Sequence, residues 1–277
     1  MTAPTGPATP ATSIGPNGEL APIVEVRDLV VSYAGRRVSS MERLDVRAGE
    51  CVAVVGESGS GKSTLLQAMT GLLAGTGAET TGSVTVDGLD VLSAPERRLR
   101  AIRGSRVAMV MQSPQGSLNP TMRLGTLIRR VLKRHGVTGA AAKARIAAAL
   151  DGVQLDAEVL NRYPHQVSGG QAQRFAIALA VALEAGVIAA DEPTSALDVT
   201  VQAEVIGVLQ RLRAERGVAV VLVSHDLALV STVADRIVVM KDGAVVDEGD
   251  VDHVLRRSTC AYTRELVAAV PTIGGDR

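Results

Sequence analysis

The sequence predicts an α/β fold with a parallel sheet at its core and a helical segment inserted into it. Short apolar runs alternate with helical patterns along most of the 277 residues, and strands that alternate with helices favour a parallel sheet with crossover helices. One apolar run, Cys51–Val55, leads directly into a glycine-rich loop and then a helix. Between residues 113 and 166 helical patterns follow one another without a convincing strand, which indicates the insertion.

The first part of the chain alternates apolar and polar residues or carries short apolar runs, both of which predict strands. A turn is expected at Asp87-Gly88. The predicted strands here are Ile23–Ser32, Glu50–Val55, Ser83–Val86 and Arg106–Met111, the predicted helix is Ser63–Leu73, and Gly75–Gly82 is expected to be a loop.

The rest of the chain returns to strands after the helical segment. The predicted helices are Leu124–Arg134, Ala140–Leu150, Asp156–Tyr163, Phe175–Leu183, Val199–Arg216 and Leu227–Ala234, and the predicted strands are Val187–Ala190, Val218–Ser224 and Arg236–Met240.

Composition excludes several classes of function. Lys plus Arg equals Asp plus Glu at 29 each, and there are three Tyr, one Phe and no Trp, so neither bulk charge nor stacking rings favour nucleic-acid binding. Cys51 and Cys260 match no metal or redox spacing. The most apolar stretch, Phe175–Ala190, is interrupted by Glu184 and is shorter than the roughly 20 apolar residues of a spanning helix.

The first 22 residues contain five of the eleven prolines and one charge, Glu19. This composition predicts a disordered tail, and a secretory signal is not expected because a basic start and a continuous apolar core are missing.

The strongest motif is a phosphate-binding loop of the pattern G-x-x-x-x-G-K-[ST]. Its glycines allow several N–H groups to point into one concavity, and the following helix adds its positive dipole end. Lys62 is expected to reach the β- and γ-phosphates, and the Ser63 hydroxyl to ligate Mg²⁺. The residues expected to bind nucleotide here are Gly56, Glu57, Ser58, Gly59, Ser60, Gly61, Lys62, Ser63 and Thr64.

Two adjacent carboxylates, Asp191 and Glu192, end the apolar run Val187–Ala190. Neighbouring side chains on a strand point to opposite sides, so we expect one carboxylate at the metal and the other at a water beside the γ-phosphate. Asp191 is the predicted metal residue and Glu192 the predicted general base.

A second device for binding anions is the Ser168-Gly169-Gly170 turn before an apolar helix, where free N–H groups and a helix dipole meet. Alone it is weak support for a site, because many helices begin in this way.

Taken together, these motifs resemble those of the ATP-binding subunit of an ATP-binding cassette (ABC) transporter, over about residues 23 to 271. The resemblance includes the signature Val167–Gln171, the run Asp191-Glu192-Pro193-Thr194 and the loop Ser195–Asp198. It also includes Gln112, His225 and Tyr33, which match the family's Q-loop glutamine, switch histidine and adenine-stacking aromatic.

The resemblance implies a P-loop NTPase (RecA-like) core with an antiparallel β subdomain and an inserted α-helical subdomain at about 113–175. It implies an ATPase domain over 23–270, between the tail 1–22 and a short tail at 271–277. Two such cassettes pack head to tail in the family, so Ser168, Gly169, Gly170 and Gln171 are expected to act on the partner's ATP, with Asp198 at the interface. The catalytic residues implied are Glu192, His225 and Gln112, and the Mg²⁺ residues are Ser63, Gln112 and Asp191.

Longer strings resemble the oligopeptide, dipeptide and nickel importer subfamily, among them Ser117–Pro120, Tyr163–His165 and Tyr262–Leu266. This implies two membrane permease subunits, a second ATPase subunit in a homo- or heterodimer, an indirect link to an extracytoplasmic solute-binding protein, and a peripheral location on the cytoplasmic face of the membrane. The short C-terminal extension favours a nickel- or metallophore-type member. The alternatives are a soluble ABC ATPase of DNA repair or translation and, more remotely, a P-loop kinase.

Overall fold

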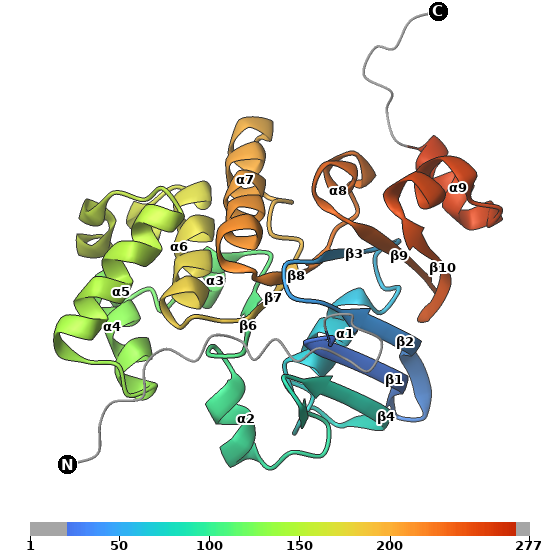
Figure 1. Cartoon of the computed structure of the whole chain (residues 1–277), viewed down its shortest axis with the longest axis horizontal. Coiled ribbons are helices and arrows are strands. Elements are labelled where there is room, and N and C mark those ends of the chain that lie inside the picture. The colour runs from blue at the N-terminus through green and yellow to red at the C-terminus, as the bar shows by residue number, and fades with distance from the viewer. Residues whose placement is uncertain (1–20, 270–277) are drawn as a thin grey trace, which may run out of the picture.

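The computed structural model describes residues 21–269, which form two sheets with helices packed around them (Figure 1). The larger sheet has the strand order β10-β9-β3-β8-β7-β6 and the smaller has the order β2-β1-β4-β5. The strands are β1 Val24–Tyr33, β2 Arg36–Val46, β3 Cys51–Val55, β4 Ala78–Val86, β5 Leu89–Asp90, β6 Val107–Val110, β7 Val187–Asp191, β8 Ala219–Val223, β9 Arg236–Lys241 and β10 Ala244–Asp250.

The larger sheet is parallel except at one edge. Strands β6, β7, β8, β3 and β9 pair in parallel, whereas β10 pairs antiparallel to β9. The smaller sheet is antiparallel throughout. The α/β fold with a parallel core and an antiparallel subdomain is therefore confirmed.

Alternate residues of the central strands face two different apolar cores. In β3, Val52 and Val54 pack with α1 and the antiparallel sheet, whereas Cys51, Ala53 and Val55 pack with the helices on the other face. A strand with both faces covered reads as a continuous apolar run, which is why β3 has no polar residue.

The helices of the inserted region gather at one end of the molecule, around α4, α5 and α6, while α9 lies at the other end near β10 (Figure 1). Among residues 21–269, no helix is both long and apolar enough to cross a bilayer. The helical elements are α1 Lys62–Met69, α2 Glu96–Ile102, α3 Pro114–Ser117, α4 Leu124–Arg134, α5 Gly139–Gly152, the 3₁₀ turns η1 Ala157–Asn161 and η2 Pro164–Gln166, α6 Gly169–Ala182, α7 Val199–Arg216, α8 Leu227–Val233, the π-helical turn η3 His253–Arg257 and α9 Ala261–Ala268.

Several predicted elements were wrong in extent. The expected loop Gly75–Gly82 contains the first half of β4. Its polar residues Thr80 and Thr81 are in a strand because they pair with β1. The helix expected over Asp156–Tyr163 is the short turn η1. The helix expected to start at Phe175 begins at Gly169, because Ser168 and Gln171 form a capping box that starts the helix there. Elements that the sequence did not predict are β2, β5, α2, α3, η2, β10, η3 and α9.

The tails expected at 1–22 and 271–277 lie outside the described residues, apart from positions 21 and 22. The domain limits at 23 and 270 therefore stay predictions.

Candidate functional site

The phosphate-binding loop lies between β3 and α1, where two glycines meet backbone that leaves no room for a side chain. A Cβ at Gly56 would lie 2.1 Å from the Met240 carbonyl oxygen, and one at Gly61 would lie 2.5 Å from that of Val38. Their φ angles of 146° and 94° also belong to the region that favours glycine. The loop is thus held against β9 and β2 in a fixed curve.

Lys62 carries its positive charge in the floor of this loop. Its ammonium donates to the carbonyl oxygens of Gly56, at 2.8 Å, and Glu57, at 2.6 Å, and the residue is 5% exposed. Burial lowers the pKa of Lys62, while the charges of Glu192 and Asp191 oppose that change. The cation is therefore positioned before any phosphate arrives.

A pocket of about 230 Å³ opens beside the loop. Strands β3, β8, β7 and β6 are neighbours in the sheet, and their carboxyl ends meet at the edge where ligands bind in open α/β sheets. The pocket is lined by Val38, Ser58, Gly59, Gly61, Lys62, Ser63, Thr64, Gln112, Asp191 and Glu192.

The two carboxylates line the same pocket, contrary to the expectation that they point to opposite sides. Asp191 ends β7, and Glu192 has a φ of 43°, in the left-handed region. The alternation of a strand does not apply beyond that turn, so both side chains reach the pocket. The Glu192 amide donates to the Val223 carbonyl at 3.0 Å, which fixes the turn against the end of β8.

Asp191 and Ser63 form the part of the pocket suited to a divalent cation. The Ser63 hydroxyl donates to Asp191 at 3.0 Å, and burial raises the Asp191 pKa against the opposing effects of Ser63 and Lys62. Mg²⁺ is usually held by one or two carboxylates together with phosphate oxygens and water, so this donor set fits Mg²⁺.

Glu192 is contacted on both carboxylate oxygens. His225 Nδ1, after β8, lies 3.2 Å from one oxygen, and the Gln112 amide donates to the other at 3.2 Å. Gln112 also donates to the Ser195 hydroxyl at 3.0 Å. Three predicted catalytic residues are thus brought together, and Ser195 is a contact that the sequence reasoning did not single out, although it directly follows the Asp-Glu-Pro-Thr motif.

The signature residues lie outside this pocket. The Ser168 hydroxyl accepts from the Gln171 amide at 3.2 Å, and the Gln171 side chain accepts from the Ser168 amide at 3.1 Å, a capping box that starts α6. A Cβ at Gly170 would lie 2.2 Å from Val201 of α7. Asp198 caps α7 through the Val201 amide at 3.0 Å.

Tyr33 also lies apart from the residues that line the pocket. It is the last residue of β1, and its hydroxyl is 3.4 Å from that of Thr76. A residue that the sequence did not mark as part of the site is Tyr262, whose hydroxyl accepts a hydrogen bond from the Glu57 amide at 3.1 Å; it stood within a quoted string, but no local pattern placed it at the loop.

Comparison with known proteins gives a consistent result. A sequence profile described as ABC transporter matches residues 41–195. The chain is 41% identical to the peptidoglycan transport ATP-binding protein YejF of Agrobacterium fabrum, over 90% of this chain and 47% of that protein. It is 37% identical to the oligopeptide transport ATP-binding protein OppD of Bacillus subtilis, over 91% of this chain and 72% of that protein.

Among solved structures, the chain resembles the ATP-binding cassette MJ0796, described as a dimer in a post-hydrolysis state bound to ADP and phosphate. The TM-score is 0.72 at 29% identity, over 82% of this chain and 98% of that chain. The chain therefore spans about half the length of YejF, about three quarters of OppD and nearly all of the solved cassette.

Proposed function

The chain belongs to the ABC transporter family and is an ATPase of that family, and from that premise we propose that it powers the import of peptides across the cytoplasmic membrane. The observation that carries the proposal is the single pocket in which Lys62 and Ser63 of the phosphate loop face Asp191, Glu192 and Gln112. Binding of ATP drives the association of two cassettes, and its hydrolysis releases them.

Hydrolysis in this pocket needs a group that accepts the proton of the attacking water. Glu192 has the position for that role, because His225 and Gln112 hold both of its oxygens in place. The water attacks the γ-phosphorus, its proton passes to Glu192, and the bond to the β-phosphate oxygen breaks. Lys62 balances the negative charge of the phosphates.

Mg²⁺ when bound would neutralise charge between the β- and γ-phosphates. Ser63 and Asp191, whose side-chain oxygens are already 3.0 Å apart, would hold the ion. Gln112 would contribute to the same coordination shell. Tyr33 is proposed to stack on the adenine ring, because it ends β1 on the same antiparallel sheet whose β2 contributes Val38 to the pocket.

A second cassette would complete the site. Ser168, Gly169 and Gly170 begin a helix outside this chain's own pocket, and Asp198 lies beside Val199, an apolar residue that is 81% exposed. A helix N-terminus that offers free N–H groups suits the γ-phosphate of a partner. The dimeric state described for MJ0796 supports this arrangement, in a homo- or heterodimer.

The membrane subunits are proposed to contact a groove of about 540 Å³ between the phosphate-loop core and the helical region. Leu72 and Met111 line it and are 41% and 43% exposed. Met111 directly precedes Gln112, so a partner that presses on the groove is linked through one peptide bond to the nucleotide pocket. This supports two permease subunits as partners and a peripheral location on the cytoplasmic face of the membrane.

The names of the relatives support peptides as cargo, through an extracytoplasmic solute-binding protein, rather than the nickel chelates that the sequence also allowed. They also disfavour a non-transport ATPase of DNA repair or translation. Uptake measurements test the proposal directly, because they identify the transported substrate without assuming which subunit binds it.

A strain carrying Lys62→Ala should lose uptake of a labelled tripeptide, whereas Arg134→Ala, which lines neither the nucleotide pocket nor the Met111 groove, should keep it. If the Lys62→Ala strain loses uptake of ⁶³Ni but keeps normal uptake of the peptide, the assignment of peptides as cargo is overturned. Normal uptake of both peptide and ⁶³Ni in the Lys62→Ala strain, together with ATP hydrolysis by the purified wild-type chain, would overturn the transport role.

A further inference from the structure

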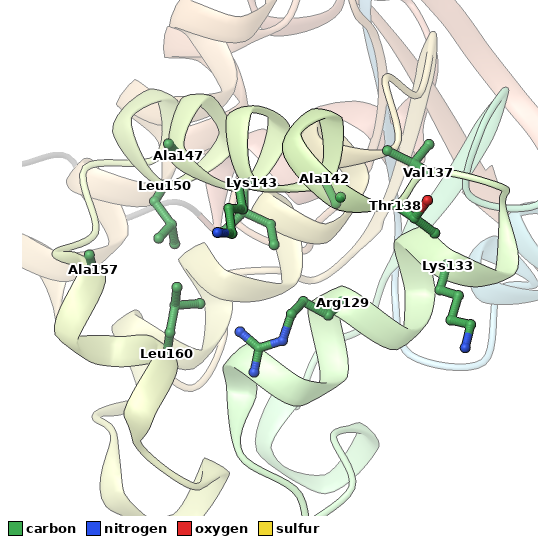
Figure 2. Close-up of a pocket in the computed structure, with 12 residues that line it drawn as sticks. Arg129, Lys133, Val137, Thr138, Ala142, Lys143, Ala147, Leu150, Ala157 and Leu160 are labelled. Atoms are coloured by element: carbon green, nitrogen blue, oxygen red, sulfur yellow. The ribbon is translucent and has the colours of Figure 1, made fainter.

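A second hollow lies in the helical region, away from the nucleotide pocket. It has a volume of about 480 Å³, is open on one side, and is bordered by α4, the segment 137–139, α5 and η1 (Figure 2). Small-molecule sites typically measure about 300–1,000 Å³ and are mostly apolar with a few charged groups. This hollow, called the helical groove below, has that size and that lining.

The walls of the helical groove are apolar. Ile146 and Leu150 of α5 form one side, and Leu160 of η1 faces Leu150 at one end (Figure 2). Ala142 and Ala147 of α5 also line the groove, and a longer side chain at either position would take up part of its volume.

Three cations border the helical groove and have no carboxylate partner within residues 21–269. Arg129 and Lys133 belong to α4 and Lys143 to α5. Two other arginines of the region are paired: Arg145 lies 2.8 Å from Glu184, and Arg174 lies 3.4 Å from Glu204. The three cations that line the groove therefore place positive charge at its opening without a neutralising carboxylate from the described part of the chain.

We propose that the helical groove binds a free, single-chain amphipathic anion, an alkyl or acyl chain that ends in a carboxylate or phosphate. Figure 2 places Arg129 on the α4 side and Lys143 on the α5 side of the opening, and the anionic head of the ligand is assigned to these two cations. A guanidinium matches carboxylate and phosphate oxygens in geometry. The chain of the ligand lies along Ile146, Leu150 and Leu160 and is removed from water.

Because the helical groove lies close to the signature turn along the chain, binding of the anion there is expected to affect the rate of ATP hydrolysis. The wall η1 ends at Asn161, and the chain reaches Ser168 after the turn η2. The side-chain amide of Gln115 also donates to the backbone carbonyl of Val167 at 3.1 Å. This hydrogen bond connects α3 to the residue before the signature turn. Occupancy is expected to change the rate of hydrolysis without changing nucleotide binding to a single chain. This consequence rests on the proposed function; binding itself does not.

Calorimetric titration of the purified full chain tests the proposal, with each probe kept below its micelle concentration. Dodecyl phosphate and dodecanoate should bind with a stoichiometry of one. Dodecyl maltoside, which has the same chain and a neutral head, and inorganic phosphate, which has no chain, should bind at least about tenfold more weakly, a difference of about 1.4 kcal/mol. Equal binding of the neutral probe, or no binding of either anion, would overturn the proposal.

Variants separate the groove from nonspecific binding. Arg129→Gln and Lys143→Gln should each weaken dodecyl phosphate about tenfold, the loss expected for one hydrogen bond to a charged group. Ala147→Phe should abolish binding by filling the hollow, and Arg134→Gln, a cation of α4 that does not line the hollow, should leave affinity unchanged. Unchanged affinity in the first three variants would overturn the site.

Sedimentation with vesicles of phosphatidylglycerol and phosphatidylcholine distinguishes binding of a membrane surface from binding of a free single-chain anion. Since the groove holds one free chain, the full-length protein should not sediment with these vesicles through Arg129 and Lys143. Sedimentation that the double variant Arg129→Gln/Lys143→Gln abolishes would assign the cations to a lipid surface and overturn the proposal.

Discussion

The backbone amide of Glu57, in the phosphate-binding loop, donates a hydrogen bond to the hydroxyl oxygen of Tyr262, 3.1 Å away in α9. Tyr262 is 7% exposed, and the Lys241 ammonium lies 4.5 Å from the centre of its ring. Thr263, the next residue, donates to Asp247 of β10 at 2.8 Å. Helix α9 is therefore anchored to the sheet on one side and contacts the nucleotide loop on the other.

Tyr262→Phe should weaken ATP binding by about two- to fivefold, because it leaves the Glu57 amide without its acceptor, a loss of about 0.5–1 kcal/mol. The ring and its packing remain, so the thermal midpoint should change little. A titration with a fluorescent ATP analogue measures the affinity. Tyr163→Phe makes the same chemical change away from the loop and should not alter it; equal effects of the two variants would show that the hydroxyl contact has no role.

Glu192→Gln should reduce ATP hydrolysis by about 100-fold or more, since an amide cannot accept the proton of the attacking water. ATP binding should persist because Lys62 and the loop are unchanged, so dimers should accumulate in the presence of ATP. Steady-state hydrolysis and light scattering measure the two effects. Glu204→Gln removes a carboxylate from the surface of α7 and serves as the control; hydrolysis at the wild-type rate in Glu192→Gln would remove that residue from its role.

Asp191→Asn should raise the thermal midpoint of the nucleotide-free chain at pH 7.5 by a small amount, on the order of 1–3 °C. Burial raises the pKa of Asp191, so the folded chain loses stability as the pH rises through that pKa and the buried carboxyl ionises. The gain from the substitution should shrink as the pH falls below the Asp191 pKa. Melting curves across pH 4–8 check this, and a gain that grows toward low pH would contradict it.

Gly170→Ala should destabilise the chain by about 1–3 kcal/mol, because its Cβ would lie 2.2 Å from Val201 and overpacking costs that much. Gly207→Ala, also in a helix but with open space around it, should stabilise by about 0.5–1 kcal/mol. Urea unfolding gives both values. Adding Val201→Ala to Gly170→Ala should restore most of the loss; no recovery in the double variant would show that the contact is not the cause.

The two cysteines should differ in reactivity. Burial raises the pKa of Cys51 to about 12, whereas hydrogen bonds from Thr263 lower the pKa of Cys260, and only the thiolate reacts. Iodoacetamide at pH 8 should therefore label Cys260 well before Cys51, as mass spectrometry would detect. Labelling of Cys51 at the same rate in the native chain would contradict this burial.

The sequence predicted the central elements well because their patterns are local. The apolar strand β3, the loop that follows it and helix α7 were visible from composition and periodicity alone. Strand β2, with its charged residues Arg36, Arg37, Glu42 and Arg43, carries no such pattern. It forms because it pairs with β1 along its length, a long-range contact that a single sequence does not reveal.

The same distinction applies to the site. Lys62, Asp191 and Glu192 belong to short motifs, so their presence in one pocket could be predicted. The turn at Glu192, which brings both carboxylates to one side, depends on its amide bonding to Val223 of another strand. The contact between Tyr262 and Glu57 joins residues 205 positions apart, and no spacing rule indicates it.

Ser168, Gly169 and Gly170 are proposed to complete a nucleotide site on a second cassette. The most direct measurement is a structure of the Glu192→Gln chain, alone or with its partner ATPase subunit, loaded with ATP and Mg²⁺. In that structure, the Ser168 hydroxyl and the glycine amides of one cassette should contact the γ-phosphate held by the other cassette's phosphate loop. A loaded dimer in which residues 168–170 lie far from every phosphate would contradict it.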